Sequence, residues 1–162
     1  MGLFSKKDKN SVCKFSHLDG LSNVKKDFTV KVTQNDELQQ LEFEQVLPKT
    51  DPLFLKYFQV CKVGIVTEKE IEERDKSVVG RAVIGGLLLG PIGAVVGGTS
   101  GVGTKKETKI KNCLVINYHP TNDINEIKVI LLEIVGATMH LSAFIKALKE
   151  KANIVESKSQ YL

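Results

Sequence analysis

Residues 82–104 read AVIGGLLLGPIGAVVGGTSGVGT, and none of these 23 positions carries a charged side chain. Nine of the 13 glycines in the 162-residue chain fall between Gly80 and Gly103. A segment of this length can cross a bilayer as a helix. On both sides the sequence returns to short runs rich in apolar and β-branched residues, which are typical of strands. The pattern therefore predicts a β-domain interrupted by one uncharged, glycine-rich insertion, which we place at residues 78–104.

The spacing of the glycines predicts a helix with one side formed by small residues, an arrangement called a glycine zipper. Two rows with a step of four residues merge into this small face, which comprises Gly86, Gly90, Gly93, Ala94, Gly97, Gly98 and Gly101. Large aliphatic side chains fall mostly on the other side, with Leu87 among the exceptions; those that we expect in the membrane or the assembly are Leu87, Leu88, Leu89, Ile92, Val95 and Val96. Small faces let helices approach closely.

The hydropathy of this segment predicts conditional membrane insertion. Its aliphatic side chains favour insertion by roughly 3 to 5 kcal/mol, but the glycines and Pro91 cancel much of this gain. Insertion is therefore marginal for one copy and becomes favourable when several copies pack their small faces together. The Gly90–Pro91 step leaves open whether the segment is one helix or a hairpin of two. Basic residues on both sides suit a re-entrant hairpin with cytoplasmic ends, or an insertion that leaves and rejoins a β-domain on one side.

Other interpretations of the same segment have to be considered. It could be a glycine-rich helical hairpin packed within a soluble protein, or a mobile loop. The run from Gly98 to Gly103 has the spacing of a phosphate-binding loop, but Thr104 stands where that motif requires Lys. A nucleotide site is therefore excluded.

The sequence outside the insertion predicts five or six antiparallel strands and one C-terminal helix. The strand signals lie at 28–32, around 41–43, at 58–66, 113–118 and 128–135, with a turn at 34–36 and a proline-containing loop at 47–53. At the C-terminal end, Thr138 is the expected N-cap of an amphipathic helix. Its apolar face, which we expect to take part in subunit assembly, comprises Leu141, Phe144, Ile145 and Leu148, followed by Ala152. We expect a small β-barrel or sandwich with this helix closing one end.

Composition excludes several classes of function. The net charge of +4, from 23 basic and 19 acidic residues, does not call for nucleic acid. The three cysteines are far apart, so no disulfide framework is implied and a reducing compartment fits. No metal-ligand spacing and no nucleophile–base pair can be nominated, so we expect no enzyme activity, no cofactor and no metal. A basic segment at 1–12 and a loose tail at 155–162 flank the domain, which we place at 13–154.

Two stretches carry a resemblance to a known family: the run from Val79 to Gly98, and Leu114-Val115-Ile116-Asn117-Tyr118 after it. Over roughly residues 13–154 the chain resembles small Gram-positive bacterial and prophage proteins that have a pleckstrin-homology-like (PH-like) domain split by a glycine zipper. It is most similar to the staphylococcal phage-triggered ring-like pore family.

That resemblance implies a homo-oligomeric ring, formed on a phage structural oligomer such as the portal, which permeabilises the bacterial membrane and kills the host. The protein would be cytoplasmic when inactive and at the cell membrane when assembled. The alternative is a soluble or membrane-peripheral interaction module whose glycine-rich hairpin packs on its own domain.

Overall fold

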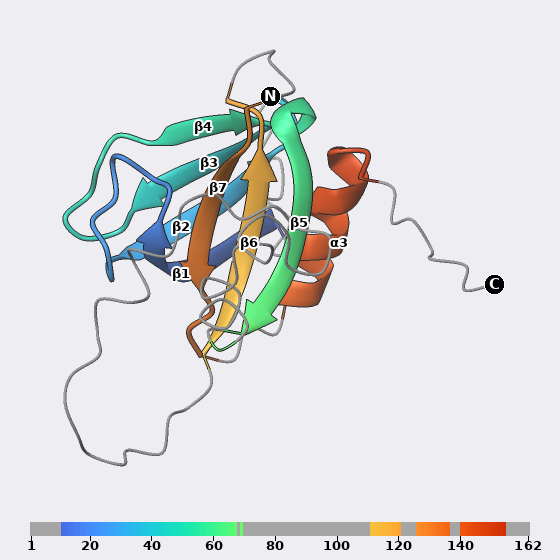
Figure 1. Cartoon of the computed structure of the whole chain (residues 1–162). Helices are drawn as coiled ribbons and strands as arrows, with labels where there is room; N and C mark the ends of the chain where they lie inside the picture. Colours follow the sequence, from blue (N-terminus) through green and yellow to red (C-terminus); the bar gives the residue numbers. More distant parts are fainter. Residues whose placement is uncertain (1–10, 68, 70–110, 121–125, 137–139, 155–162) are drawn as a thin grey trace.

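The computed structural model describes residues 11–67, 69, 111–120, 126–136 and 140–154, which form one antiparallel sheet and a C-terminal helix (Figure 1). The predicted zipper segment and the tail lie outside these residues. The elements are β1 (Val12–Asp19), β2 (Thr29–Asn35), β3 (Gln40–Gln45), β4 (Leu53–Lys56), the 3₁₀ turn η2 (Tyr57–Gln59), β5 (Val60–Thr67), β6 (Asn112–Tyr118), β7 (Lys128–Glu133) and α3 (Leu141–Lys151).

The seven strands have the order β4-β3-β2-β1-β7-β6-β5, and every neighbouring pair is antiparallel. Figure 1 shows the sheet strongly curled, with α3 beside β5. The prediction of a mainly β, antiparallel domain with one C-terminal helix is confirmed. Of the barrel or sandwich that the sequence predicts, the structure has a curled sheet that does not close, because β4 and β5 are its two edges and do not pair with each other. The side chains of α3 help to fill the curled sheet instead.

The hydrophobic core lies on the inner face of the sheet and takes side chains from all strands and α3. Its largest fully buried members are Tyr57, Phe15, Phe43, Phe144, Leu41 and Leu114. The rings of Phe15 and Phe144 meet edge to face, with their centroids 6.2 Å apart. Each such side chain contributes about 1.5 to 3 kcal/mol through burial. This cluster explains why the domain holds its curled shape without closing the ring of strands.

The predicted strands agree with the structure where apolar and polar residues alternate, as in β2 and β3, and where a short apolar run marks a strand buried on both faces, as in β6 and β7. Two strands were missed: β1, whose inward positions include His17, and the four-residue β4 after Pro52. The predicted strand at 58–66 begins later, at Val60, because η2 precedes it and leaves Phe58 76% exposed. The part of the chain that the structure describes therefore contains seven strands, where five or six were expected.

The C-terminal helix has the predicted apolar face. Phe144, Ile145 and Leu148 are buried, while Leu141 and Ala152 are partly buried against the same core. The helix begins after His140 as its N-cap, so the predicted cap was wrong; Thr138 itself lies outside the described residues. The last turn is basic, which suits the negative end of the helix dipole.

The glycine that follows β1 lies very close to the backbone of the neighbouring strand β7. Gly20 follows β1 with φ of +95°, and a Cβ atom there would lie 2.2 Å from the carbonyl oxygen of Val129 in β7. Only glycine combines that backbone angle with that close approach. The chain can therefore leave β1 directly beside the backbone of β7.

Candidate membrane and assembly site

The insertion is attached at the paired ends of two neighbouring strands. In the antiparallel register of β5 and β6, Thr67 lies opposite Asn112, and Val66 opposite Cys113. Residues 68–111 therefore leave and rejoin the sheet at one point, as the basic flanks had suggested. The pairing of β5 with β6 continues to Val60 and Tyr118 at the far end, with one irregularity near Cys61. The two strands thus form a hairpin whose connection is the insertion.

The predicted zipper residues lie outside the part of the chain that the structure describes. These are Gly86, Gly90, Gly93, Ala94, Gly97, Gly98 and Gly101, with the aliphatic residues Leu87, Leu88, Leu89, Ile92, Val95 and Val96. Their role in the membrane stays a prediction. Among the described residues, no helix has the length and apolar character needed to span a membrane.

The sheet has a second apolar cluster beside the attachment point, on the face opposite the core. It comprises Val66, Cys113, Val115, Val129 and Leu131, with Leu18 partly buried against it. We call these six residues the outer apolar face. Along β6, Leu114 and Ile116 join the inner core, while Cys113 and Val115 belong to the outer face. Both sides of β6 and β7 are therefore apolar, which is typical of strands covered on both faces.

Burial on the outer apolar face is complete at its centre. Val115 and Leu131 are each 0% exposed, and Cys113 is 1% exposed. Side chains on an uncovered sheet face remain in contact with water, so this burial indicates a covering layer. In the described part of the chain, this cluster contains only strand residues, because the helix and the buried loop residues join the inner core.

A polar side chain continues the same row. Asn117 follows Val115 at a spacing of two residues on β6, so it points to the same side, and it is also 0% exposed. Neither its Nδ2 nor its Oδ1 atom has a hydrogen-bond partner among the described residues. A buried amide without partners is costly, about 1 to 3 kcal/mol, so it points to a polar group beyond the sheet. The sequence pattern places Asn117 in a strand and in a stretch that carries the family resemblance, but gives its side chain no role of its own.

Charged groups border the attachment point. The Nζ atom of Lys111 lies 3.4 Å from Oε1 of Glu133, which is opposite Cys113 in the register of β6 and β7. This ion pair is partly exposed and is worth little to stability. It marks the boundary between the outer apolar face and the charged sequence that flanks the zipper.

The buried face of α3 contains the residues expected to mediate assembly. Phe144, Ile145 and Leu148 pack within their own domain, and Leu141 is partly buried there. Their role between subunits stays a prediction. The helix also borders a groove of about 690 Å³ against β5, with Ile65, Ile145 and Ile154 among its apolar lining and Lys146, Lys149 and Glu150 around it. Ile65 is 50% exposed, which strand alternation alone would not have predicted.

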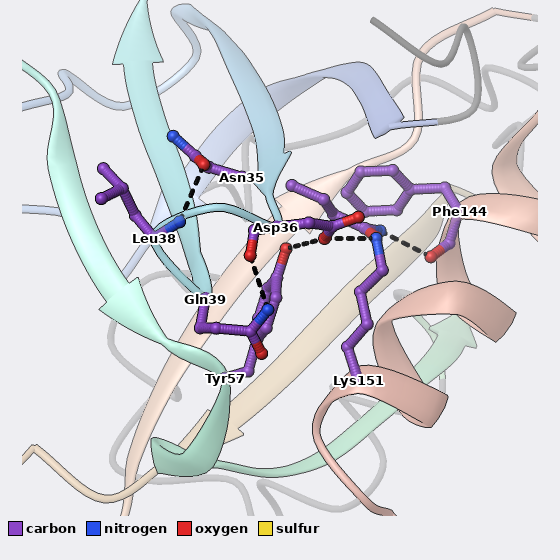
Figure 2. A network of polar contacts seen from close by, with 8 residues as sticks. Asn35, Asp36, Leu38, Gln39, Tyr57, Phe144 and Lys151 are labelled. Atoms are coloured by element: carbon purple, nitrogen blue, oxygen red, sulfur yellow. Dashed lines mark hydrogen bonds and ion pairs between the residues drawn. The ribbon is translucent and has the colours of Figure 1, made fainter. Parts of the chain in front are cut away.

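A polar network fastens α3 to the turn between β2 and β3 (Figure 2). Asp36 accepts a hydrogen bond of 2.9 Å from the Tyr57 hydroxyl and pairs with Lys151 at 2.7 Å. Burial would raise the pKa of Asp36, but the hydrogen bonds from Lys151 and Tyr57 outweigh it and lower that pKa. Burial, and then the carboxylate of Asp36, raise the pKa of Tyr57.

Gln34 continues this network into the helix. Its Nε2 atom donates to the carbonyl oxygen of Phe144 at 2.8 Å, and its Oε1 atom accepts from Lys151 at 2.8 Å. The network therefore holds both ends of the buried helical face against the β2–β3 hairpin. The network has a structural role, because it holds α3 in place against the inner face of the curled sheet.

Two thiols and the metal-ligand residue types are the other chemical groups to consider among the described residues. Burial raises the pKa of the Cys13 and Cys61 thiols, which disfavours the reactive thiolate. Among the described residues, no group of three or more His, Cys, Asp and Glu side chains is placed to hold a metal ion. The features that the described residues do bring together are an attachment point, an apolar face and a buried amide.

Comparison with protein families matches the chain to the family described as a glycine zipper containing PH domain, over residues 15–131. The match begins in β1, ends in β7 and spans the whole insertion, and it covers more than half of the chain. Comparisons with curated proteins and with solved structures give no match.

Proposed function

The chain belongs to the family of glycine-zipper-containing PH domains, and on that premise we propose that it is a non-enzymatic, oligomerising membrane-active protein. In this proposal the zipper at 78–104 enters the bacterial membrane when several copies come together, and the resulting ring permeabilises that membrane. The observation that carries the proposal is the pairing of Thr67 with Asn112 at the root of the insertion.

Because of that pairing, the fold of the domain does not depend on where the insertion lies. The β5–β6 hairpin and the inner core are made by residues on either side of the insertion. The insertion can therefore change its surroundings while the domain keeps its fold. A membrane-active segment needs such independence, because it must pass from water to lipid without unfolding the part that brings the copies together.

Assembly supplies the free energy that a single insertion lacks. Packing the small faces of several copies adds close backbone contacts, which stabilise helix association in lipid. A trigger that gathers copies would then convert a marginal segment into an inserted one. We propose a phage structural oligomer such as the portal as that trigger, and an antiphage defence role that ends in host death. The protein would be cytoplasmic before assembly and at the cell membrane afterwards.

A matched pair of substitutions in the zipper tests this function. Gly97→Leu places a large side chain on the small face, whereas Val96→Leu changes the neighbouring aliphatic side by one methylene group. We expect Gly97→Leu to reduce dye release from anionic phospholipid vesicles at least tenfold, and Val96→Leu to leave it nearly unchanged. Circular dichroism should show the same β-domain in both. Full dye release by both Gly97→Leu and Gly90→Leu would contradict the zipper role.

A second experiment tests the trigger in cells. Carbonate-resistant membrane fractions are compared for the full chain and for a 78–104 deletion, with and without phage infection. We expect only the full chain to enter the membrane, and more strongly on infection. If both proteins stay out of the membrane in every condition, the interaction module with a packed hairpin becomes the better function.

A further inference from the structure

The outer apolar face raises the question of what covers it. Val115 and Leu131 at its centre are 0% exposed, although α3 and the buried loop residues of the described chain belong to the opposite, inner core. A face with one row of apolar side chains on β6 and another on β7 needs a second layer to exclude water. The layer has to reach the same end of the sheet as Val66 and Cys113.

We propose that the outer apolar face is the docking surface for the chain's own zipper segment, 78–104, before assembly. The attachment point favours this occupant over any other. Residues 68–111 leave at Thr67 and return at Asn112, and the next residues along the two strands, Val66 and Cys113, are the first members of the face. A segment tethered there has an effective concentration of the order of millimolar at this face.

The flanks are long enough to let the segment lie across the whole face. The shorter one, residues 105–111, spans at most about 25 Å when extended. The row from Cys113 to Asn117 on β6 extends about 13 Å. The segment can therefore reach Asn117 from its tether without disturbing the pairing of β5 with β6.

The chemistry of the segment matches the face. Residues 82–104 are uncharged and rich in aliphatic and glycine residues, so they can cover Val115 and Leu131 without burying a charge. Glycine also lets the backbone come close to a neighbouring surface. The Asn117 amide offers one donor group and one acceptor, and a nearby peptide group offers the complementary pair. Docking would thus give the buried amide the partners that it lacks among the described residues.

Docking and membrane insertion use the same aliphatic side chains, so they exclude each other. The docked monomer would keep the zipper out of the membrane until assembly competes for it. Only this consequence rests on the proposed function, because the docking itself concerns the unassembled protein in water.

Two native cysteines test the docking in a Cys61→Ser background. Cys113 lies on the outer apolar face and Cys13 in the inner core. In the full chain, we expect both thiols to react slowly with iodoacetamide. In the 78–104 deletion, Cys113 should react at least tenfold faster, while Cys13 stays slow and reports that the core is intact. Equal protection of Cys113 in both proteins would overturn the proposal.

Photo-crosslinking in the full chain keeps the test independent of the deletion. A benzoylphenylalanine replaces Leu18, the partly buried member of the outer apolar face, or Lys31, which lies on the charged part of the same side of the sheet. In the purified monomer without membranes, we expect crosslinks from position 18 to residues 78–104 and none from position 31. A crosslink to a second copy, or none from position 18, would overturn the docking. Vesicle leakage is measured separately, so failure of the pore function would leave this result distinct.

Discussion

The outer side of the sheet has two regions with opposite character. On β2 and β3, Glu44 pairs with Lys31 at 2.6 Å and with Lys49 at 3.1 Å. On β6 and β7, the corresponding positions are apolar, and Val115 and Leu131 are completely buried. Both regions share one inner core, so folding of the domain does not require the difference. The comparison teaches that the inner apolar core is sufficient to fold the sheet. The second, outer apolar face therefore points to a contact with a further layer that covers it.

The largest expected effect comes from placing a charge in the apolar region. Val115→Asp would bury a carboxylate without a partner, so we expect it to lower the free energy of unfolding by about 3 kcal/mol or more. Lys14→Asp on the exposed outer side of β1 should change it by less than about 0.5 kcal/mol. Urea unfolding measures both values.

The two substitutions, Val115→Asp and Lys14→Asp, test whether the apolar and the charged regions of the outer side really differ. If Val115→Asp costs as little as Lys14→Asp, the apolar region is open to water and its cover is lost in solution. Repeating Val115→Asp in the 78–104 deletion then shows whether the cost depends on the zipper segment, as docking requires.

The next effect concerns Gly20, where the chain leaves β1 close to the backbone of β7. Gly20→Ala combines a strained φ with a Cβ atom 2.2 Å from the carbonyl oxygen of Val129, so we expect a loss of about 3 kcal/mol. Gly136 also has positive φ, +73°, but a Cβ atom there meets nothing within 4 Å. Gly136→Ala should therefore cost only about 1 kcal/mol. Thermal unfolding compares the two, and equal losses would mean that the close approach to β7 relaxes freely.

Much of the fold could be predicted from the sequence because the inner core follows simple alternation. Val30 and Val32, or Leu41 and Phe43, alternate with polar residues, and the structure buries them as expected. The edge strand β4 was missed because its four residues follow Pro52 and present Phe54 to solvent. Strand β1 was missed because His17 occupies an inward position, where its Nε2 atom accepts from the backbone of Leu21. The sheet stays open between its edge strands β4 and β5, and side chains of α3 fill the inner core there. This packing between distant segments cannot be predicted from a local sequence pattern.

The candidate site divides in the same way. Glycine spacing predicts the zipper, and the β-rich flanks predict that the chain leaves and rejoins a sheet. The outer apolar face could not be recognised beforehand, since a run such as Cys113 to Ile116 does not say which side meets the core. Asn117 lies within the predicted strand at 113–118, but the apolar run does not show that its side chain shares the outer row with Val115 and is buried there.

A smaller effect is expected from Asn117→Leu, which replaces the buried amide by an apolar group of similar size. If the zipper segment supplies its hydrogen bonds, the substitution removes them and lowers stability by about 1 kcal/mol in the full chain. In the 78–104 deletion the loss should disappear. A gain in stability of the full chain, measured by urea unfolding, would mean that the amide has no partner at all.

The smallest effect belongs to the charged region and depends on pH. Hydrogen bonds from Lys31 and then Lys49 lower the pKa of Glu44 from its usual value of 4.5. A lowered pKa contributes stability above the unfolded value, and this contribution disappears as the pH falls through the folded pKa. We therefore expect Glu44→Gln to lower the unfolding temperature slightly at neutral pH, with the difference from the unsubstituted protein vanishing in acid below the folded pKa. Added salt should shrink it further, because the charges are near the surface.

The apolar region has no such ionised group at its centre, so Val115→Ala should produce a loss that stays constant over the same pH range. A loss that is pH-dependent for Val115→Ala and constant for Glu44→Gln would reverse the assignment of the two regions.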